Sequence, residues 1–255
     1  MRILFMGTPE FAAAALAAIA KAYPNEVVGA VTRQDTPKNR GHAMTPPPVK
    51  ILAQSLGIPV YQPANLKAEN FRETLDACAP DIIIVAAYGR ILPAYVLDAP
   101  RFGCINIHAS LLPKYRGAAP IQRAILAGET EVGVTIMKME AGIDTGDMYK
   151  KASFSLTGTE NYGEIHDRLA ALGAELITDV MEQLFRGTAH AEKQNDTLAT
   201  YAAKIEKEDR LLSFDAPAAE IINKIRAFSP VPGAEATLPT GKLKITAAKC
   251  AGDAP

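Results

Sequence analysis

The chain has 255 residues, with 27 lysines and arginines against 28 aspartates and glutamates, and a formal net charge of −1. Apolar residues make up 48% and charged residues 22%, which is typical of a globular protein with one large domain or one domain plus a small one. No segment approaches the roughly 20 apolar residues of a membrane span, and the short apolar run at the start is no signal peptide, so we expect a cytoplasmic protein.

Short apolar segments typical of buried strands recur at residues 2–6, 26–31, 81–87, 104–108 and 132–137. Helical patterns fall at residues 11–22, 49–56, 68–77 and 119–127. Strands that alternate with helices predict a doubly wound, mostly parallel sheet. At the first strand-to-helix join we expect Thr8 to cap the helix and Pro9 to take its first position.

The second half of the chain predicts further elements. Residues 148–156 are strand-like and are expected to pair antiparallel with residues 132–137, and a long helix covers residues 162–186. A polar stretch without periodicity follows, and then come a helix at residues 217–228 and strands near 234–238 and 242–247. We therefore expect a catalytic domain at 1–188, a linker at 189–207 and a second, partial domain at 208–255.

Asn106 and His108 lie on one face of the strand at residues 104–108, because side chains alternate along a strand. They come at its carboxyl end, where open α/β sheets place their ligands. Asp144, in a glycine-bounded loop at residues 140–146, is the candidate partner. An amide, an imidazole and a carboxylate suit acyl transfer without a covalent intermediate. A satisfied core histidine and an ordinary turn aspartate remain the alternatives.

Other chemistries are less well supported. The Gly7-Thr8-Pro9 turn has one glycine where a dinucleotide fingerprint needs three. Ser110 lacks the flanking glycines of a hydrolase nucleophile elbow. The four histidines and three cysteines are too scattered for metal-ligand spacing or a disulfide framework, so we expect no metal.

Basic residues gather in two places despite the balanced net charge. The stretch 33–50, RQDTPKNRGHAMTPPPVK, has four lysines and arginines against one aspartate, and Lys114, Arg116 and Arg123 add three more positive charges. These groups indicate contact with a phosphodiester backbone. A solvated loop and helix face is the alternative reading.

Six stretches, in this order along the chain, resemble the methionyl-tRNA formyltransferases of bacterial and organellar type, within the folate-dependent formyltransferase superfamily. They are MRILFMGTPEFA, TPPPVK, PDIIIVAAYGRILP, GCINIHASLLPKYRGAAPIQRAILAGE, GVTIMKMEAGIDTGDM and NKIRAFSPVPGA. The resemblance runs from residue 1 to about residue 235. The block at residues 103–148 is specific to the superfamily, whereas the start, the basic loop and GIDTGDM favour the tRNA enzymes.

This resemblance implies a Rossmann-like catalytic domain with the formyltransferase fold, followed by a C-terminal OB-like β-barrel. It implies transfer of a formyl group from 10-formyltetrahydrofolate, the co-substrate, to the α-amino group of methionine on initiator methionyl-tRNA. The expected partners are that tRNA and the folate, with no membrane, and the chain is expected to be a monomer.

The resemblance also assigns residues to roles. Asn106, His108 and Asp144 match the family's catalytic triad. The folate-binding motif matches Ser110, Leu111, Leu112 and Pro113, and the loop that lines the pterin pocket matches Tyr88, Gly89, Arg90, Ile91 and Leu92. Arg40 matches the arginine of the family's mobile loop that enters the tRNA acceptor stem, and we expect the basic residues Lys114, Arg116 and Arg123 to hold the tRNA with it.

Two features depart from the family pattern. Val231 stands where a tryptophan is usual, and family members continue past the position of Pro255 for about another half-barrel. Rival functions are formyl transfer to a sugar nucleotide or to glycinamide ribonucleotide, a non-catalytic folate- or RNA-binding module, and hydrolysis of formyl-folate. The basic loop and the second domain argue against a small acceptor.

Overall fold

A computed structural model describes residues 1–38, 43–239 and 241–249 of the chain. It divides into two compact units that interleave along the sequence. Unit 1 comprises Met1–His108, Val134–Ala152 and Leu169–Asn195. Unit 2 comprises Ala109–Gly133, Ser153–Arg168 and the chain from Asp196 onward. Two internal segments are thus grouped with the C-terminal part, and the domain boundaries near residues 188 and 208 stay a prediction.

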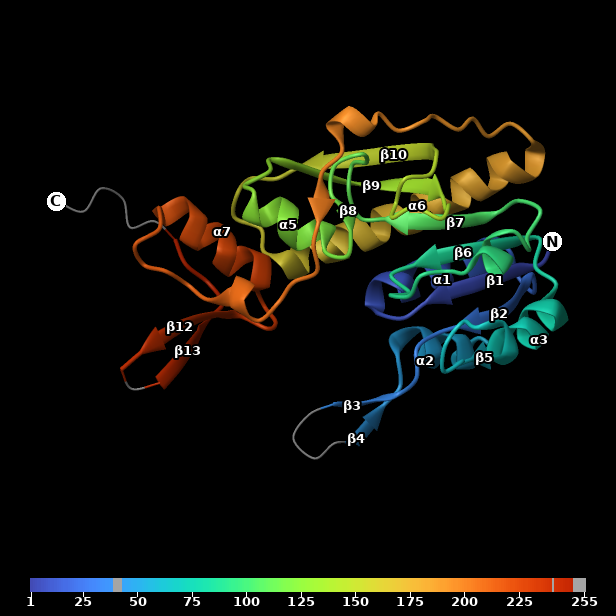
Figure 1. Cartoon of the computed structure of the whole chain (residues 1–255), viewed down its shortest axis with the longest axis horizontal. Helices are drawn as coiled ribbons and strands as arrows, with labels where there is room; N and C mark the ends of the chain where they lie inside the picture. Colours follow the sequence, from blue (N-terminus) through green and yellow to red (C-terminus); the bar gives the residue numbers. More distant parts are fainter. Residues whose placement is uncertain (39–42, 240, 250–255) are drawn as a thin grey trace. The chain divides into compact units, whose positions relative to one another are not determined.

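A seven-stranded sheet forms the centre of the fold, with strand order β10-β9-β7-β6-β1-β2-β5 (Figure 1). Its strands are β1 (Ile3–Gly7), β2 (Val27–Val31), β5 (Val60–Tyr61), β6 (Ile82–Ala86), β7 (Cys104–His108), β9 (Glu131–Lys138) and β10 (Met148–Ser155). Strand β1 pairs parallel with both β2 and β6, and β6 pairs parallel with β7, whereas β9 runs antiparallel to β7. The mostly parallel sheet expected from the sequence is confirmed.

The strand order reverses at β1, because the chain goes from β1 to β2 and β5 on one side and returns to β6 and β7 on the other. Open α/β sheets bind ligands beyond the carboxyl ends of the strands at such a switch point. The carboxyl ends of β6 and β7 carry the segments that the sequence singles out, after Ala86 and at His108. The topology thus fixes where the site must lie.

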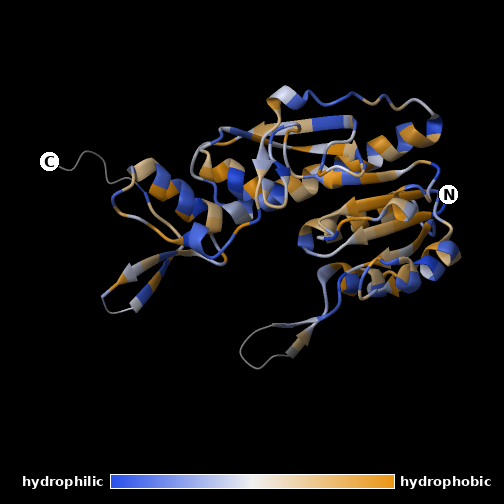
Figure 2. Cartoon of the chain, viewed as in Figure 1, coloured by the Kyte–Doolittle hydropathy of each residue, from blue (hydrophilic) through white to orange (hydrophobic). Residues whose placement is uncertain are grey.

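Both faces of the central strands β1, β6 and β7 are buried. One face carries Leu4, Met6, Ile83 and Val85 and forms a cluster with residues of α3 (Ala68–Cys78), while Val96 of α4 (Ala94–Leu97) joins it. Figure 2 shows the central strands as predominantly hydrophobic. Because parallel strands are covered by helices on both faces, they are apolar nearly throughout, so a polar pair on β7 stands out.

Helix α1 (Glu10–Ala22) covers the other face, where Phe11 is buried. The expected cap is wrong: Pro9 is the residue before the helix, and no side chain caps it. The Thr8 hydroxyl instead donates to the carbonyl of Tyr88 at 3.5 Å. The Pro9 carbonyl accepts from the backbone N–H groups of Ala12 and Ala13, which fixes the helix start without a capping hydroxyl.

The predicted basic loop contains a short antiparallel ribbon of β3 (Thr36–Lys38) and β4 (Ala43–Thr45), followed by α2 (Pro48–Ser55). At its base, Lys50 pairs with Asp35 at 2.7 Å, and Gln62 donates to the same carboxylate at 2.8 Å. These contacts anchor the ribbon in unit 1. Arg40, the predicted tRNA-binding residue of this segment, lies outside the described residues.

Unit 2 contains two helices that pack on each other, α5 (Pro120–Leu126) and α7 (Ala218–Phe228). Its strands form two small sheets, the parallel pair of β8 (Arg116–Gly117) with β11 (Tyr201–Ala202) and the antiparallel hairpin of β12 (Ala234–Leu238) with β13 (Gly241–Ile245). Within the described part of the C-terminal segment, the only strands past α7 are those of this hairpin, so the expected OB-like barrel stays a prediction.

The residues predicted as a linker, 189–207, form backbone hydrogen bonds and short secondary-structure elements. Glu192 exchanges two backbone hydrogen bonds of 2.8 Å with Met148, the first residue of β10. Two short 3₁₀ turns, Asp196–Leu198 and Glu208–Arg210, flank β11. Sequence periodicity cannot find such a segment, because single backbone pairs to a strand edge leave no apolar pattern.

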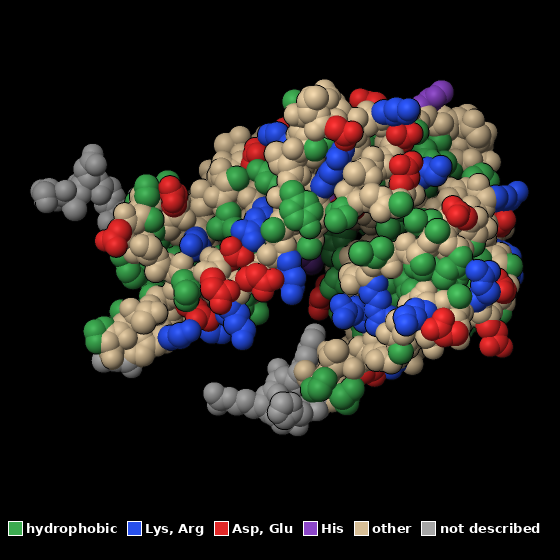
Figure 3. All heavy atoms as spheres, in the orientation of Figure 1, with side chains coloured by type: hydrophobic (Ala, Val, Ile, Leu, Met, Phe, Trp, Pro, Cys, Tyr) green, Lys and Arg blue, Asp and Glu red, His purple; other side chains and the backbone are tan. Residues whose placement is uncertain are grey.

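The surface has no strong charge segregation on the face shown in Figure 3, where basic and acidic side chains are interspersed. This agrees with the net charge of −1. Among the described helices, none combines the length and apolar character needed to cross a membrane.

Side-chain hydrogen bonds cap the N-terminus of helix α6 (Tyr162–Arg186). The Asn161 side chain accepts from the Glu164 N–H at 3.1 Å, and Glu164 accepts from the Asn161 N–H at 2.8 Å, a reciprocal capping box. Just before it, the Glu160 carboxylate accepts backbone N–H bonds from Thr157 and Gly158 at 3.0–3.1 Å. Burial raises the pKa of Glu160, but these hydrogen bonds outweigh burial and lower it to about 2.

Because this pKa is depressed, the ionised carboxylate stabilises the folded state above the unfolded value near pH 4.5, and the contribution is lost as pH falls toward about 2. Glu160→Gln should therefore lower the free energy of unfolding by about 1–3 kcal/mol at pH 7. The difference from the unsubstituted chain should shrink between pH 4.5 and 2, as measured by denaturant unfolding at each pH.

Glu73→Gln, at an exposed position on α3, is the matched control and should change little. A constant difference between the Glu160 variant and the parent across this pH range would contradict the assignment.

Candidate active site

Strand β7 places two polar side chains inside unit 1. Asn106 and His108 are 9% and 5% exposed, although the strand has apolar neighbours on both sides. Asn106 lies opposite Val85 of β6 and Met137 of β9, and His108 lies opposite Thr135. On the other face, Gly173 of α6 approaches Ile107 so closely that a Cβ there would come within 2.8 Å of its side chain. The helix thereby fixes the strand from behind.

Asp144 meets both side chains. Its Oδ1 accepts a hydrogen bond from Asn106 Nδ2 at 3.5 Å, and its Oδ2 lies 3.6 Å from His108 Nδ1. The carboxylate is 17% exposed and the imidazole is 6% exposed. One carboxylate therefore contacts an amide and an imidazole that stand side by side. Catalytic hydrogen bonds of this length often shorten when substrate binds.

The loop at residues 140–147 holds Asp144 in an unusual backbone conformation, with a φ of +50°. Non-glycine residues adopt such angles rarely, so the surroundings must hold it there. Gly146 approaches β9 closely: a Cβ on it would lie 2.0 Å from the Lys138 carbonyl oxygen. The Asp147 carbonyl accepts from the Lys138 N–H at 2.8 Å, which closes the loop onto the end of β9.

A cavity of about 160 Å³ adjoins Asp144 within unit 1. From the predicted pterin loop, Arg90, Ile91 and Leu92 line it. The rest of its wall is made by Leu97, Met137, Met139, Glu140, Ala141, Gly142 and Ile143. Much of this wall is apolar, and Ile91 and Ile143 are exposed, which suits a flat heteroaromatic ring.

Tyr88 and Gly89 belong to the same predicted loop but do not line the cavity. Tyr88 is 1% exposed and packs in the core cluster with Leu92, and its hydroxyl makes no hydrogen bond within the described residues. Burial raises the pKa of Tyr88. Tyr88 therefore anchors the loop in the core. The Arg90 guanidinium donates a hydrogen bond to the carbonyl of Pro63 at 2.9 Å.

Ser110, Leu111, Leu112 and Pro113, the predicted folate motif, follow β7 directly and are assigned to unit 2. The Ser110 hydroxyl donates to the Lys114 carbonyl at 2.6 Å, and Leu112 is buried. The serine hydroxyl therefore closes a turn, which agrees with the sequence argument against a nucleophile.

The predicted tRNA-binding cations of unit 2 differ in how they are held. Arg123 is bound to both carboxylate oxygens of Asp209, at 3.1 and 2.9 Å, and to the carbonyls of Ala203 and Lys204. Arg116 pairs with Asp196 at 2.6 Å and is 12% exposed. Lys114 is 56% exposed and lies 3.4 Å from Glu129. Lys114 is thus the most accessible cation of the three.

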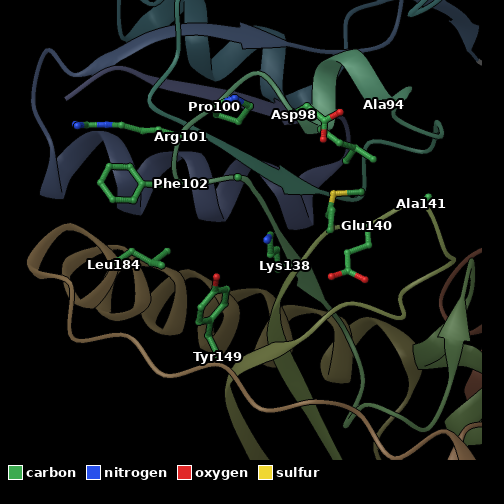
Figure 4. Close-up of a pocket in the computed structure, with 13 residues that line it drawn as sticks. Ala94, Asp98, Pro100, Arg101, Phe102, Lys138, Glu140, Ala141, Tyr149 and Leu184 are labelled. Carbon is green, nitrogen blue, oxygen red and sulfur yellow. The ribbon is translucent and has the colours of Figure 1, made fainter.

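A second cavity, of about 590 Å³, also lies within unit 1. Met139, Glu140, Ala141 and Leu97 line both cavities. Figure 4 shows Lys138, the last residue of β9, and Tyr149 of β10 near the centre of this cavity, with Phe102 toward one end and Glu140 toward the other. Residues 139–141, which precede the Asp144 loop, therefore line both cavities, while Met139 also packs against the core cluster and donates its N–H to the Cys104 carbonyl at 2.7 Å.

Two parts of the site escape sequence reasoning. The residues at 137–143 that line the smaller cavity carry no chemical signal, although their position just before Asp144 could have suggested them. Gln194 lies in the predicted linker, yet its amide binds the carbonyls of Asp144 and Gly146. No pattern in the sequence points to that contact.

Chemically, the arrangement offers a hydrogen-bond donor, an imidazole and a carboxylate beside a partly apolar cavity. An amide N–H and an imidazole can stabilise an oxyanion that forms on an acyl group, and the carboxylate can orient both. Among the described residues, no group of three or more histidines, cysteines, aspartates and glutamates is arranged to hold a metal ion.

Comparison with known proteins identifies the family to which this geometry belongs. The model of the formyl transferase family matches residues 1–181, and that of the formyl transferase C-terminal domain matches residues 204–254. The chain belongs to the formyl transferase family. A methionyl-tRNA formyltransferase from Aromatoleum aromaticum is 51% identical to this formyl transferase over 245 residues, which cover 96% of this chain and 77% of the relative.

Solved structures share the fold of this formyl transferase. Methionyl-tRNA formyltransferase from Clostridium thermocellum matches with a TM-score of 0.67 and 18% identity, covering 100% of this chain and 95% of that one. The sugar 3N-formyl transferase WlaRD, solved in the presence of dTDP and 5-N-formyl-THF, matches with a TM-score of 0.67 and 20% identity, covering 89% of this chain and 79% of that one.

The close approach of Gly146 to β9 generates a prediction. Gly146→Ala should lower the free energy of unfolding by about 1–3 kcal/mol, because the added methyl group meets a backbone carbonyl that cannot move without breaking the Lys138–Asp147 hydrogen bond. Thermal or denaturant unfolding measures the loss. Ala141→Ser, at an exposed position of the same loop, is the control. Equal stability of the two variants would show that the loop yields freely.

Proposed function

We propose that this formyl transferase moves the formyl group of 10-formyltetrahydrofolate onto the α-amino group of methionine carried by initiator methionyl-tRNA. The observation that carries the proposal is the meeting of Asn106, His108 and Asp144 at the carboxyl end of β7. The choice of acceptor is supported by the 51% identity to a relative named methionyl-tRNA formyltransferase over 96% of the chain. As the family's chemistry is acyl transfer, the site needs to stabilise one oxyanion and move one proton.

The reaction begins when the neutral amine attacks the formyl carbon. A carbon–nitrogen bond forms, the carbonyl π pair moves onto oxygen, and a tetrahedral oxyanion results. An Asn side chain has two N–H donors. One of them faces Asp144 in the structure, and the other is assigned to the oxyanion, together with a donor from His108.

The intermediate then collapses. The bond from the formyl carbon to N10 of the folate breaks, the attacking nitrogen gives up a proton, and N10 gains one. Asp144 is assigned two tasks in this step: it fixes the imidazole through Nδ1, and its negative charge favours the cationic ring while the oxyanion exists. Direct attack by the amine needs no nucleophile from the protein.

The pterin ring of the donor is assigned to the cavity of about 160 Å³ that Asp144 adjoins. Its apolar wall, made largely by Ile91, Leu92 and Met139, would cover the flat ring, and the carboxylate of Asp144 lies at its edge. Ser110, Leu111, Leu112 and Pro113 retain their assignment to folate binding from the family motif.

The acceptor stem of the tRNA is assigned to Arg40, Lys114, Arg116 and Arg123. The contacts of Arg116 and Arg123 suggest that these two residues play a different part from Lys114. Arg116 and Arg123 pair with Asp196 and Asp209, so their charges are partly neutralised. Their proposed contribution to tRNA binding is mainly to hold the 196–209 segment in place. Lys114 is the exposed cation that can contact phosphate directly.

The proposal is tested with the purified protein and a labelled formyl donor, offered charged initiator methionyl-tRNA beside a 4-amino sugar nucleotide. We expect label on the methionine amine alone. Label on the sugar would assign the acceptor to the small-molecule class, and formate released without any acceptor would make the protein a hydrolase. Either result overturns the proposal.

Substitution of the three side chains should separate chemistry from binding. Asn106→Ala, His108→Ala and Asp144→Asn should each lower kcat by about 10²- to 10⁴-fold, since each removes an interaction that strengthens in the transition state. The dissociation constant of the folate donor should change less than about 3-fold for Asn106→Ala and His108→Ala, because neither residue lines the cavity. Near-normal turnover by any of the three would refute its assignment.

The two best-defined cations of unit 2 should behave differently. Lys114→Ala should raise the KM for tRNA about 3- to 10-fold and flatten its dependence on salt, with little change in stability, because the side chain is exposed. Arg123→Ala should instead lower the free energy of unfolding by about 1–3 kcal/mol, since it leaves the Asp209 carboxylate without its bidentate partner. The reverse pattern would contradict these roles.

A further inference from the structure

Asp144 contacts Asn106 and His108 only if its loop keeps a strained backbone. The φ of +50° at Asp144 disfavours the conformation, and residues 140 and 141, just before it, line two cavities. The Lys138–Asp147 hydrogen bond closes the base of the loop, and a contact from outside the loop holds its tip at residues 144–146.

Gln194 supplies that support. Its side-chain Nε2 donates to the carbonyl oxygen of Asp144 at 2.8 Å and to that of Gly146 at 2.8 Å. Both hydrogens of one amide group are thus spent on two carbonyls that flank Thr145. Gln194 is half-buried, while the residues on either side of it are exposed. The contact fixes the direction in which the Asp144 side chain leaves the backbone.

The glutamine is itself anchored. Two residues earlier, Glu192 exchanges two backbone hydrogen bonds of 2.8 Å with Met148, which begins β10. The 192–194 segment therefore lies along the edge of the sheet just past the loop, and Gln194 reaches back over it. All of these residues belong to unit 1.

We propose that Gln194 is a positioning residue for formyl transfer, which clamps the 144–146 backbone so that the Asp144 carboxylate faces Asn106 and His108. This inference rests on the proposed function of the site. The geometry demands an amide at this length. A glutamate would turn carboxylate oxygens toward two carbonyl oxygens, and an asparagine is one methylene too short to reach both.

The test compares Gln194→Ala, Gln194→Glu and Gln194→Asn with the parent chain in formyl transfer to methionyl-tRNA. We expect kcat to fall about 10- to 100-fold in the alanine and glutamate variants, with KM for donor and tRNA changed less than about 3-fold. The asparagine variant should recover part of the loss, because it can still donate to one carbonyl. Gln183→Ala removes a comparable 2.8 Å side-chain bond, to Asp179, and should leave turnover unchanged.

Two readouts separate positioning from a general structural role. In an Asp144→Asn background, Gln194→Ala should cost less than about 2-fold in kcat, because the carboxylate that it positions is already gone. Amide hydrogen exchange at residues 144–147 should be at least about 10-fold faster in Gln194→Ala than in Gln183→Ala.

An equal loss of kcat in both backgrounds, or unchanged exchange in the loop, would overturn the assignment. A parent chain that transfers no formyl group, combined with faster exchange in Gln194→Ala, would refute the proposed function but retain the clamp.

Discussion

One carboxylate, that of Asp144, has to lie between an amide and an imidazole that point the same way from one strand. Strand alternation puts Asn106 and His108 on a common face, and the antiparallel strand β9 returns the chain so that its following loop ends beside them. Neither part is sufficient alone. Two polar groups on a buried strand would cost free energy without a partner, and a carboxylate in a left-handed turn would have no reason to stay there.

The two sides of the site are held in different ways, because Asn106 and His108 lie on a strand of the sheet whereas Asp144 lies on a loop. Strand β7 is held between β6 and β9, and α6 packs closely on it at Gly173. Residues of the loop, in contrast, line two cavities, and the loop is held by hydrogen bonds from Gln194 and by the close approach of Gly146 to β9. The proposed mechanism therefore combines a strand that is packed on both sides with a loop held by a few polar contacts.

Much of this could be read from the sequence, for physical reasons. Buried parallel strands such as residues 82–86 are continuously apolar, and long helices such as α6 keep their periodicity, so both were predicted nearly to the residue. The pairing of Asp144 with β7 was predicted as a candidate only, because spacing along a chain does not show that a loop reaches a strand. The two-residue strands β5, β8 and β11 and the 192–194 segment could not be predicted, since each is paired at only one or two residues and so leaves no apolar pattern. The prediction that Thr8 caps α1 was wrong, because its hydroxyl donates to the Tyr88 carbonyl instead.

The most direct measurement is a double-mutant cycle of His108→Ala and Asp144→Asn on the single-turnover rate of formyl transfer. If the Asp144 carboxylate acts by orienting the His108 ring and stabilising positive charge on it, Asp144→Asn should lower the single-turnover rate by a factor at least about 10-fold smaller in the His108→Ala background than in the parent chain. Strictly additive losses, within about 2-fold, would contradict the account, because the two side chains would then contribute independently.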